Sequence, residues 1–370
     1  MLCTKQQCTG CGACAAACPQ NAITLAASGG FFYPIVNKKM CTSCGLCTRA
    51  CPVLDYPYGN LAPVIYEAVH KDEAQRAAST SGGVFPALAA HVLEEGGLVC
   101  ASVMERDFFV RMRLSDDPTQ IEAMRGTKYV QGQTGDSFRQ IKAQLEAGRK
   151  VLFVGLPCQV AGLKKFLGKP CFSLLTVDLI CHGAPSPLVF SDYIKNLPEP
   201  VCAVDFRDKS AGWKHPIFTL RYASGRVDKT PLFKNEFGRA FGASLLARES
   251  CSSCPFAKVP RVGDITLGDF WGIETVNPAP EALSKGVSLL AVNSIKGADA
   301  LRHSLPLIQV ERREPDIVSA YNPRFESPAA KNPQRDAFFA LYEKRGYTAV
   351  YKKYLRVSLW RKLLRKLSGR

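Results

Sequence analysis

The stretch CTGCGACAAACP at residues 8–19 decides the fold of the N-terminal part of the chain, because residues 41–52 repeat its spacing as CTSCGLCTRACP. Both copies have the pattern Cys-x2-Cys-x2-Cys-x3-Cys-Pro, which is typical of bacterial two-cluster iron–sulfur domains. In such domains three close thiolates hold one 4Fe–4S cluster and the fourth reaches the other cluster. The spacing therefore predicts two ligand sets: Cys8, Cys11, Cys14 and Cys51 for the first cluster, and Cys41, Cys44, Cys47 and Cys18 for the second.

Zinc sites and disulfides are the alternatives for this repeat. Zinc usually takes two Cys pairs in separate knuckles, whereas each copy here places four Cys close together and ends in Pro. Two complete copies favour a ferredoxin-like domain, which moves electrons one at a time.

Four of the remaining eight cysteines can form another group. Cys158 and Cys181 each follow a short apolar run that predicts a buried parallel strand. Because parallel strands end at one sheet edge, we expect both thiols along that edge. Cys251 and Cys254 add a Cys-x2-Cys pair, so four thiolates are available for a third 4Fe–4S cluster or for zinc; Cys158 and Cys181 as plain core residues are the other alternative. The cysteines without partners by spacing are Cys3, Cys100, Cys171 and Cys202.

Residues 61–330 show the pattern of a mixed α/β structure. Residues 315–335 are rich in Pro, Asn and Ser and predict a linker. From Val350 onward, apolar residues recur at helical spacing opposite basic residues, which predicts an amphipathic helix. Strands are expected at 64–69, 98–103, 151–154, 174–180 and 217–222, and helices at 82–95 and 138–147.

The chain carries a formal charge of +16, but the charge is uneven. Residues 344–370 hold ten basic side chains and no acidic one. A nucleic-acid partner would require basic residues across a recognition fold or stacking aromatics, so we expect none. The basic helix suits either anionic lipid at a membrane surface or docking on its own domain with a solvated basic face.

The length of 370 residues predicts two or three domains. No apolar run approaches the roughly 18 residues that a membrane-spanning helix needs. A patterned cysteine at residue 8 leaves no room for a signal peptide, so we expect a cytoplasmic protein, with the tail allowing peripheral contact at the inner face of the membrane.

Six further strings, in this order along the chain, resemble one known family. They are STSGG (79–83), GTKYVQ (126–131), FVGLPCQVAGL (153–163), DLICHGAPS (178–186), FRDKSAGW (206–213) and DITLGDFWG (264–272). The family is the coenzyme F-420 hydrogenase/dehydrogenase beta subunit. The resemblance implies an FAD flavoprotein that passes electrons between a hydride-carrying coenzyme and iron–sulfur clusters, with a redox partner protein or ferredoxin. It also implies that Cys158, Cys181, Cys251 and Cys254 hold a third 4Fe–4S cluster.

The string at residues 79–83 suits a phosphate group. Ser79 and Ser81 precede a helix that starts near Val84, and Ser81 is expected to cap it. Gly82 and Gly83 would let a pyrophosphate approach the positive end of the helix dipole, which suits FAD. The alternative is a simple capped helix start.

Lys128 and Tyr129 follow Gly126 and could place a cation near the flavin ring or phosphate. The alternative is a surface lysine and a half-buried tyrosine. The segment KKYL at 352–355 resembles a bacterial branch of the family found beside surface-polysaccharide genes.

We therefore predict an α+β protein in which a ferredoxin-like domain with two 4Fe–4S clusters joins a mixed α/β flavin-binding domain and a C-terminal amphipathic helix. The predicted function is that of an iron–sulfur flavoprotein oxidoreductase. The alternatives are a non-catalytic polyferredoxin subunit and a reductase in surface-polysaccharide biosynthesis. The predicted divisions are 1–60 (ferredoxin domain), 61–150 (N-terminal region of the family, FAD-binding), 151–330 (C-terminal region, third cluster and flavin site) and 331–370 (basic tail).

Overall fold

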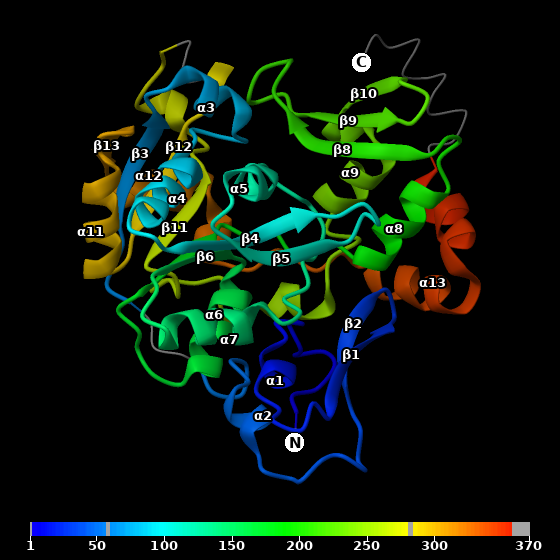
Figure 1. The fold of residues 1–370 in the computed structure, drawn as a ribbon. Helices are drawn as coiled ribbons and strands as arrows, with labels where there is room; N and C mark the ends of the chain where they lie inside the picture. The colour runs from blue at the N-terminus through cyan, green and yellow to red at the C-terminus, as the bar shows by residue number, and fades with distance from the viewer. Residues whose placement is uncertain (1, 57–59, 280–283, 357–370) are drawn as a thin grey trace, which may run out of the picture.

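A large mixed sheet forms the centre of the molecule in a computed structural model that describes residues 2–56, 60–279 and 284–356 (Figure 1). Its strands are β3 (Val64–His70), β4 (Leu98–Met104), β5 (Val110–Ser115), β6 (Val151–Gly155), β7 (Leu174–Leu179), β11 (Ile265–Asp269), β12 (Ser288–Val292) and β13 (Ile308–Arg313). Their order is β13-β3-β12-β11-β7-β6-β4-β5. The strands β4, β6, β7 and β11 run parallel, so their carboxyl ends share one edge.

Helices cover both faces of this sheet. The helices α4 (Val84–Glu94), α5 (Pro118–Met124) and α11 (Ile295–Ser304) pack on one face, and α6 (Ser137–Glu146), α7 (Pro157–Leu167) and α12 (Pro315–Tyr321) pack on the other. In β6, Leu152 packs toward the first face while Val151 and Phe153 pack toward the second. Burial on both faces explains why β6 is a continuous apolar run and why β7 is mostly apolar, with Thr176 and Asp178 as its polar residues.

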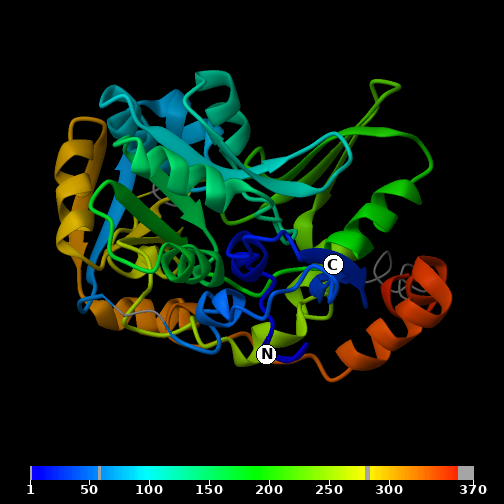
Figure 2. The same ribbon diagram turned by 60° about the horizontal axis from the view of Figure 1, so that its bottom comes forward.

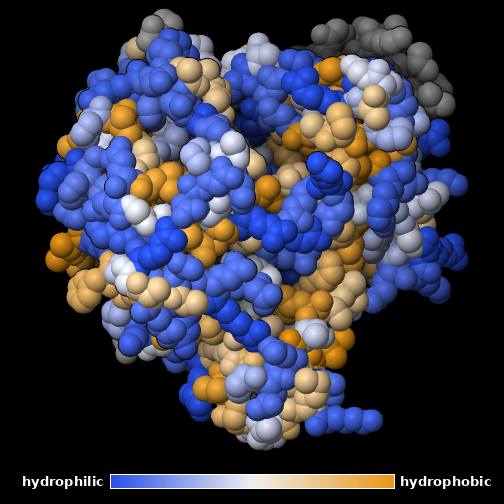
Figure 3. Space-filling view, viewed as in Figure 1, coloured by the Kyte–Doolittle hydropathy of each residue, from blue (hydrophilic) through white to orange (hydrophobic). Residues whose placement is uncertain are grey.

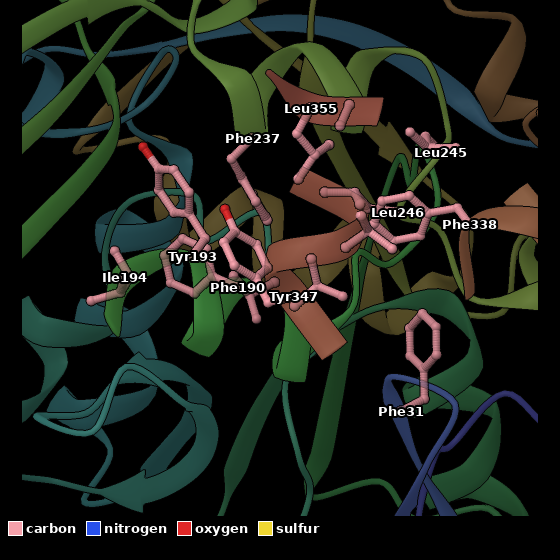
Figure 4. Close-up of a cluster of buried hydrophobic side chains, with 14 of the residues drawn as sticks. Phe31, Phe190, Tyr193, Ile194, Phe237, Leu245, Leu246, Phe338, Tyr347 and Leu355 are labelled. Atoms are coloured by element: carbon pink, nitrogen blue, oxygen red, sulfur yellow. The ribbon is translucent and has the colours of Figure 1, made fainter. Parts of the chain in front are cut away.

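A smaller antiparallel sheet lies beside the large one. It consists of β8 (Val201–Asp208), β9 (Ile217–Tyr222) and β10 (Val227–Pro231) and packs with α8 (Pro187–Lys195), α9 (Glu236–Gly242) and α13 (Arg335–Val350). Figure 4 shows this core, in which Phe190 and Tyr193 of α8 pack against Phe237 of α9, and Phe338 of α13 belongs to the same buried cluster. The short elements are α3 (Glu73–Ala78), η1 (Leu232–Lys234), η2 (Glu249–Ser253), η3 (Ile273–Thr275), η4 (Pro323–Phe325) and η5 (Tyr351–Leu355).

The N-terminal domain contains α1 (Ala13–Ala16), β1 (Ile23–Ser28), β2 (Phe31–Val36) and α2 (Leu46–Arg49), with β1 and β2 paired as a hairpin. Gly12 and Gly45 start the two helices at φ values of 79° and 74°, a backbone conformation that favours glycine. Figure 2 shows this domain between the large sheet and α13. The ring of Phe31 lies 5.3 Å from that of Phe339 on α13, so the two ends of the described chain pack together.

The predicted strands and helices of the α/β part are all present, with ends shifted by a residue or two. The predicted linker at 315–335 is wrong, because α12 and η4 occupy much of it and Val318 and Phe325 are buried. The predicted C-terminal amphipathic helix lies largely in 357–370, outside the described residues. Before that point, Tyr347, Val350 and Leu355 are buried in the core, so this part docks on its own domain.

Candidate redox site

A cavity of about 860 Å³ opens at the carboxyl edge of the parallel strands. Residues at the ends of β6, β7 and β11 form its floor, including Gly155, Ile180 and Asp269. This is the position at which open α/β sheets bind their ligands. A volume of this size falls within the range of cofactor pockets.

The loop at residues 79–83 lines the cavity but differs in detail from the prediction. The expected cap by Ser81 is wrong: its hydroxyl donates to the Val287 carbonyl at 2.8 Å, and Gly83, at φ 88°, is the N-cap of α4 without a side-chain hydrogen bond. The first amides of α4 are therefore not satisfied by a capping side chain. Ser79 lines the cavity too, while its hydroxyl donates to the Gln75 carbonyl at 2.8 Å.

Gly82 packs against the sheet instead of the cavity. Its amide donates to the Ser288 hydroxyl at 2.9 Å, and an added Cβ would lie 2.2 Å from the Ala68 carbonyl oxygen. Only glycine fits this approach of the loop to β3 and β12.

Lys128 lines the cavity and also caps the C-terminal end of a helix. Its ammonium donates to the carbonyls of Ala123, Met124 and Arg125 at 2.8–3.1 Å, at the C-terminal end of α5. Burial lowers the pKa of Lys128 to about 7, against the opposing charge of Asp205. The position of Lys128 is therefore fixed by backbone groups.

Tyr129 forms part of an aromatic wall. Its ring stacks on Phe241 at 4.4 Å, and its hydroxyl lies 3.3 Å from Arg207. Burial raises the pKa of Tyr129, so the phenol stays protonated.

An ion pair that was not expected from the sequence joins two of the strings that resemble the family. Arg207 at the end of β8 lies 2.5 Å from Asp269 at the end of β11, and the indole of Trp213 donates to the other carboxylate oxygen at 3.1 Å. Trp213 in turn stacks on Trp271, with ring centres 5.1 Å apart. The cavity is lined by Arg207, Asp269 and Trp271. The Arg207–Asp269 ion pair was not predictable from the sequence because the two residues lie far apart in it.

The cavity wall is strongly basic. Asp269 is the one acidic side chain among its described lining residues, and burial lowers the pKa of His182, which keeps that ring neutral. The basic side chains are Arg125, Lys128, Arg207, Lys214, Arg239 and Arg324. Such a wall suits an anionic ligand.

A second cavity shares a wall with the first. It is lined by Cys158, Cys181, Cys251 and Cys254, the four cysteines that the sequence grouped. Cys181 lines both cavities, and Thr9 of the N-terminal domain closes the far side. The structure therefore brings the four thiols together between the large cavity and the ferredoxin-like domain.

The four thiols reach this place from three parts of the chain, because Cys254 directly follows η2. Cys158 lies in the first turn of α7, Cys181 follows β7, and Cys251 is in η2, where it accepts from the Ala184 amide at 3.3 Å. Burial raises the pKa of Cys181 to about 12, and the neighbouring thiolates Cys251 and Cys254 add to the shift. Burial and the other three thiolates also raise the pKa of Cys158. Deprotonation of four crowded thiols in this buried site would need a compensating cation.

A buried ion pair holds two of these segments together. Arg261, after the Cys-x2-Cys pair, lies 3.0 Å from Asp178 at the end of β7. Asp178 also accepts from the Gly263 amide at 2.9 Å and the Thr266 hydroxyl at 2.6 Å.

The first predicted ligand set of the N-terminal domain is also brought together. Burial raises the pKa of Cys11 to about 11, and the charges of Cys8 and Cys51 add to the shift. Burial and these same neighbours raise the pKa of Cys14. Cys3, which had no partner by spacing, hydrogen-bonds with both Cys8 and Cys51 and lowers the pKa of each to about 6.

Arg248 was missed by sequence reasoning. Its buried guanidinium donates to the Cys8 carbonyl at 2.6 Å and the Gln131 side chain at 3.1 Å, and it lies 3.7 Å from the Cys8 sulfur. It also covers the ring of Tyr33 at 4.1 Å. Arg248 thus stands between the first ligand set and Cys251, three residues further along the chain.

The second ligand set lies at the outer end of the domain. Cys41 and Cys44 are exposed, Cys47 is in α2, and Cys18 follows α1 and accepts from the Ala22 amide at 3.3 Å. Cys100 is buried in β4, whereas Cys202 is exposed on β8. Within the described residues, no group of three or more His, Cys, Asp or Glu side chains is arranged to hold a single metal ion.

These features define a protein with an N-terminal 4Fe–4S dicluster domain and a large cavity at the edge of a mixed sheet. The 4Fe–4S dicluster domain family matches residues 7–54. The family described as coenzyme F420 hydrogenase/dehydrogenase, beta subunit matches with its N-terminal part at residues 65–136 and its C-terminal part at residues 148–316. The chain belongs to this family.

One solved structure that the chain matches is the F420-reducing [NiFe] hydrogenase complex from Methanosarcina barkeri, in a xenon-derivatized form. The match has 16% identity and a TM-score of 0.47, and it covers 80% of this chain and 92% of that chain. A comparison with functionally curated proteins gave no match. Over the described residues, no helix has the length and apolar character needed to cross a bilayer.

Proposed function

We propose that the chain is a cytoplasmic iron–sulfur flavoprotein oxidoreductase that passes electrons between a hydride-carrying coenzyme and 4Fe–4S clusters. The observation that supports it most is the wall shared by the basic cavity and the four-cysteine cavity. FAD, when bound, supplies the exchange between a two-electron hydride and single electrons.

The residues of the large cavity fit FAD. The uncapped start of α4 and the loop at residues 79–83 would receive the pyrophosphate, because helix N-termini attract anions. Tyr129 and Trp271 offer aromatic surface for the ring system, and Cys181 marks the end nearest the thiols. The six basic side chains would also attract an anionic hydride carrier such as F-420.

The protein's own groups hold this cavity rigid. The Arg207–Asp269 pair ties β8 to β11, and Lys128 ties its loop to α5. Preorganised groups of this kind orient a bound cofactor without further movement.

The three cysteine sets would form a relay of 4Fe–4S clusters. The set of Cys158, Cys181, Cys251 and Cys254 adjoins the large cavity. It also adjoins the first set, because the charge of Cys11 acts on Cys158 and an added Cβ on Gly162 of α7 would lie 3.0 Å from the Cys11 sulfur. The second set would be the terminal one.

The four predicted segments would then have separate tasks. Residues 1–60 would carry the outer two clusters, and residues 61–150 and 151–330 would share the flavin cavity, since both contribute strands to the large sheet. Within residues 331–370, α13 would pack against the N-terminal domain.

Anaerobic purification with quantitation of iron, sulfide and flavin tests the proposal. We expect about twelve iron atoms and one FAD per chain. A preparation with full iron but no flavin, even after incubation with FAD, would instead support the polyferredoxin alternative.

A panel of donors identifies the hydride carrier. Reduction of the flavin under anaerobic conditions by F-420, NADH, NADPH or reduced ferredoxin would be followed by absorbance. Flavin that responds to reduced ferredoxin alone would argue against a hydride carrier and favour a reductase role, as in surface-polysaccharide biosynthesis.

A further inference from the structure

The outer end of the N-terminal domain, here the tip, comprises residues 35–49. Cys41 and Cys44 are exposed there, whereas Cys8, Cys11 and Cys51 of the first set are buried. A cluster held at the tip is therefore the one that an external protein can approach.

The tip has only one sign of charge. Residues 1–54 contain no Asp or Glu, while Lys38, Lys39 and Arg49 flank the exposed cysteines and are themselves exposed. Among the described residues, none of these three side chains forms an ion pair, since no acidic group lies near enough. Their charge is therefore directed at solvent.

Apolar side chains lie among these charges. Met40 is 47% exposed next to Cys41, and Leu46 is 36% exposed next to Cys47. Ile35 is 57% exposed at the end of β2. Figure 3 shows apolar and polar residues mixed over the lower end of the molecule. Exposed apolar groups within a charged rim are typical of a protein interaction site.

We propose that the tip is the docking surface for a small acidic one-electron carrier protein of the ferredoxin or flavodoxin class. The inference rests on the proposed function, because it requires a cluster held by Cys18, Cys41, Cys44 and Cys47. It adds the place of contact and the charge of the partner. One electron crosses in each encounter, so the carrier is oxidised by one electron and the protein reduced by one, or the reverse.

The charges explain why an acidic partner can approach this end. A 4Fe–4S cluster with four thiolates carries about −2 when oxidised and would repel an anionic carrier. Lys38, Lys39 and Arg49 offset that charge at the point of contact. The formal charge of +16 on the whole chain adds long-range attraction.

A charge-reversal pair tests the proposal. The test variant is Lys38→Glu/Lys39→Glu, and the matched control is Lys195→Glu/Arg312→Glu, which makes the same charge change at exposed positions on α8 and β13. The probes are an acidic two-cluster bacterial ferredoxin and a basic c-type cytochrome. Dissociation constants are measured for the iron-loaded full chain by calorimetry at low and at physiological ionic strength.

We expect the test variant to bind the acidic ferredoxin about tenfold more weakly at low ionic strength, with a smaller salt dependence. The control variant should lose much less, and the basic cytochrome should bind the test variant at least as well as wild type. Equal losses in both variants would overturn the proposal, because they would show only a response to net charge.

Three further outcomes are informative. Unchanged ferredoxin affinity of the test variant, with its iron content intact, would overturn the docking surface but leave the proposed function standing. If instead the test variant loses co-sedimentation with phosphatidylglycerol vesicles while ferredoxin binding is unchanged, the tip contacts membrane and the carrier proposal is wrong. A chain without flavin that still binds ferredoxin at the tip would contradict the proposed function alone.

Discussion

Arg248 places a positive charge beside one sulfur of the first ligand set. Hydrogen bonds and positive charge near a cluster favour its reduced form, which carries the extra electron. We expect Arg248→Met to make the midpoint potential of that cluster more negative, as followed by redox titration with electron paramagnetic resonance.

Two variants separate this effect from loss of stability. Arg248→Lys keeps the charge and should restore part of the potential. Arg76→Met removes another buried arginine, which donates to the Gly286 carbonyl away from the cysteines, and should leave the potential unchanged. A midpoint potential in Arg248→Met equal to that of wild type would contradict the proposed effect of Arg248 on the first cluster.

Asp269 is the charge partner of Arg207 in the large cavity. Removing one member of a largely buried pair leaves the other charge uncompensated, so Asp269→Asn should lower the free energy of unfolding by about 3 kcal/mol. The same change leaves the cavity wall wholly basic, so affinity for an anionic ligand such as ADP should not weaken.

Urea unfolding and equilibrium dialysis measure the two quantities. Asp299→Asn is the control, because Asp299 is half-exposed in its pairs with Arg302 and His303 and should change stability by less than about 0.5 kcal/mol. Weaker ADP binding in Asp269→Asn would show that the carboxylate contacts the ligand.

Lys128 should make stability depend on pH. Burial lowers its pKa to about 7 in the folded protein, against an ordinary value of 10.5. Between these values the unfolded chain binds more protons than the folded one, so the contribution of Lys128 to stability rises as pH increases from about 7 to about 10.5.

The measurement is the difference in melting temperature between wild type and Lys128→Met over this range. Subtraction of the variant removes the titration of other groups. The melting temperature of wild type minus that of Lys128→Met should increase with pH. A constant or decreasing value would contradict the lowered pKa of Lys128 in the folded protein.

At the scale of elements, the four-cysteine site depends on the convergence of β6, β7 and the segment at η2. Replacing Cys158 and Cys254 by Ser removes thiols that enter from α7 and from beyond η2. We expect iron to fall from about twelve to about eight per chain, since one cluster of three is lost.

Iron and sulfide assays on anaerobically purified protein measure this loss. The control replaces Cys100 and Cys202 by Ser. These two cysteines lie on β4 and β8 and belong to none of the three sets, so this variant should keep all of the iron. Unchanged iron in the test variant would contradict a third cluster.

Sequence reasoning succeeded where one pattern had one physical cause. The run at β6 is apolar and that at β7 mostly apolar because both faces are buried, and the cysteine repeat has a spacing that few other sites share. It failed at α12, where Pro315 was taken as a linker residue although proline favours the first turn of a helix.

The candidate site was predictable only in part for a related reason. The loop at 79–83 was found, but the hydroxyl of Ser81 was drawn to the Val287 carbonyl on a distant segment, which no local pattern reveals. The contacts of Arg207 with Asp269, and of Arg248 with Cys8, likewise join residues far apart in the sequence.

At the scale of the whole molecule, the two ends of the described chain depend on each other. Phe339 of α13 packs at a tilt against Phe31 and approaches Gly30, where an added Cβ would lie 2.6 Å from its ring. Phe339→Ala should therefore destabilise the protein by about 3–5 kcal/mol and accelerate the loss of cluster absorbance in air.

The rate of bleaching under air, followed by visible absorbance, measures this protection. Phe172→Ala is the matched control, because Phe172 is 96% exposed and contributes little to packing. Equal bleaching rates in both variants would show that α13 does not shield the N-terminal domain.

The packing of Phe31 on Phe339 also bears on the order of synthesis. A ribosome makes about 5–20 residues each second, so the N-terminal cysteines emerge long before α13 exists. During that interval the hairpin β1–β2 lacks its final cover, and the cellular machinery that delivers iron and sulfide has open access to it. Packing of α13 would then cover this hairpin only after the clusters could have been inserted.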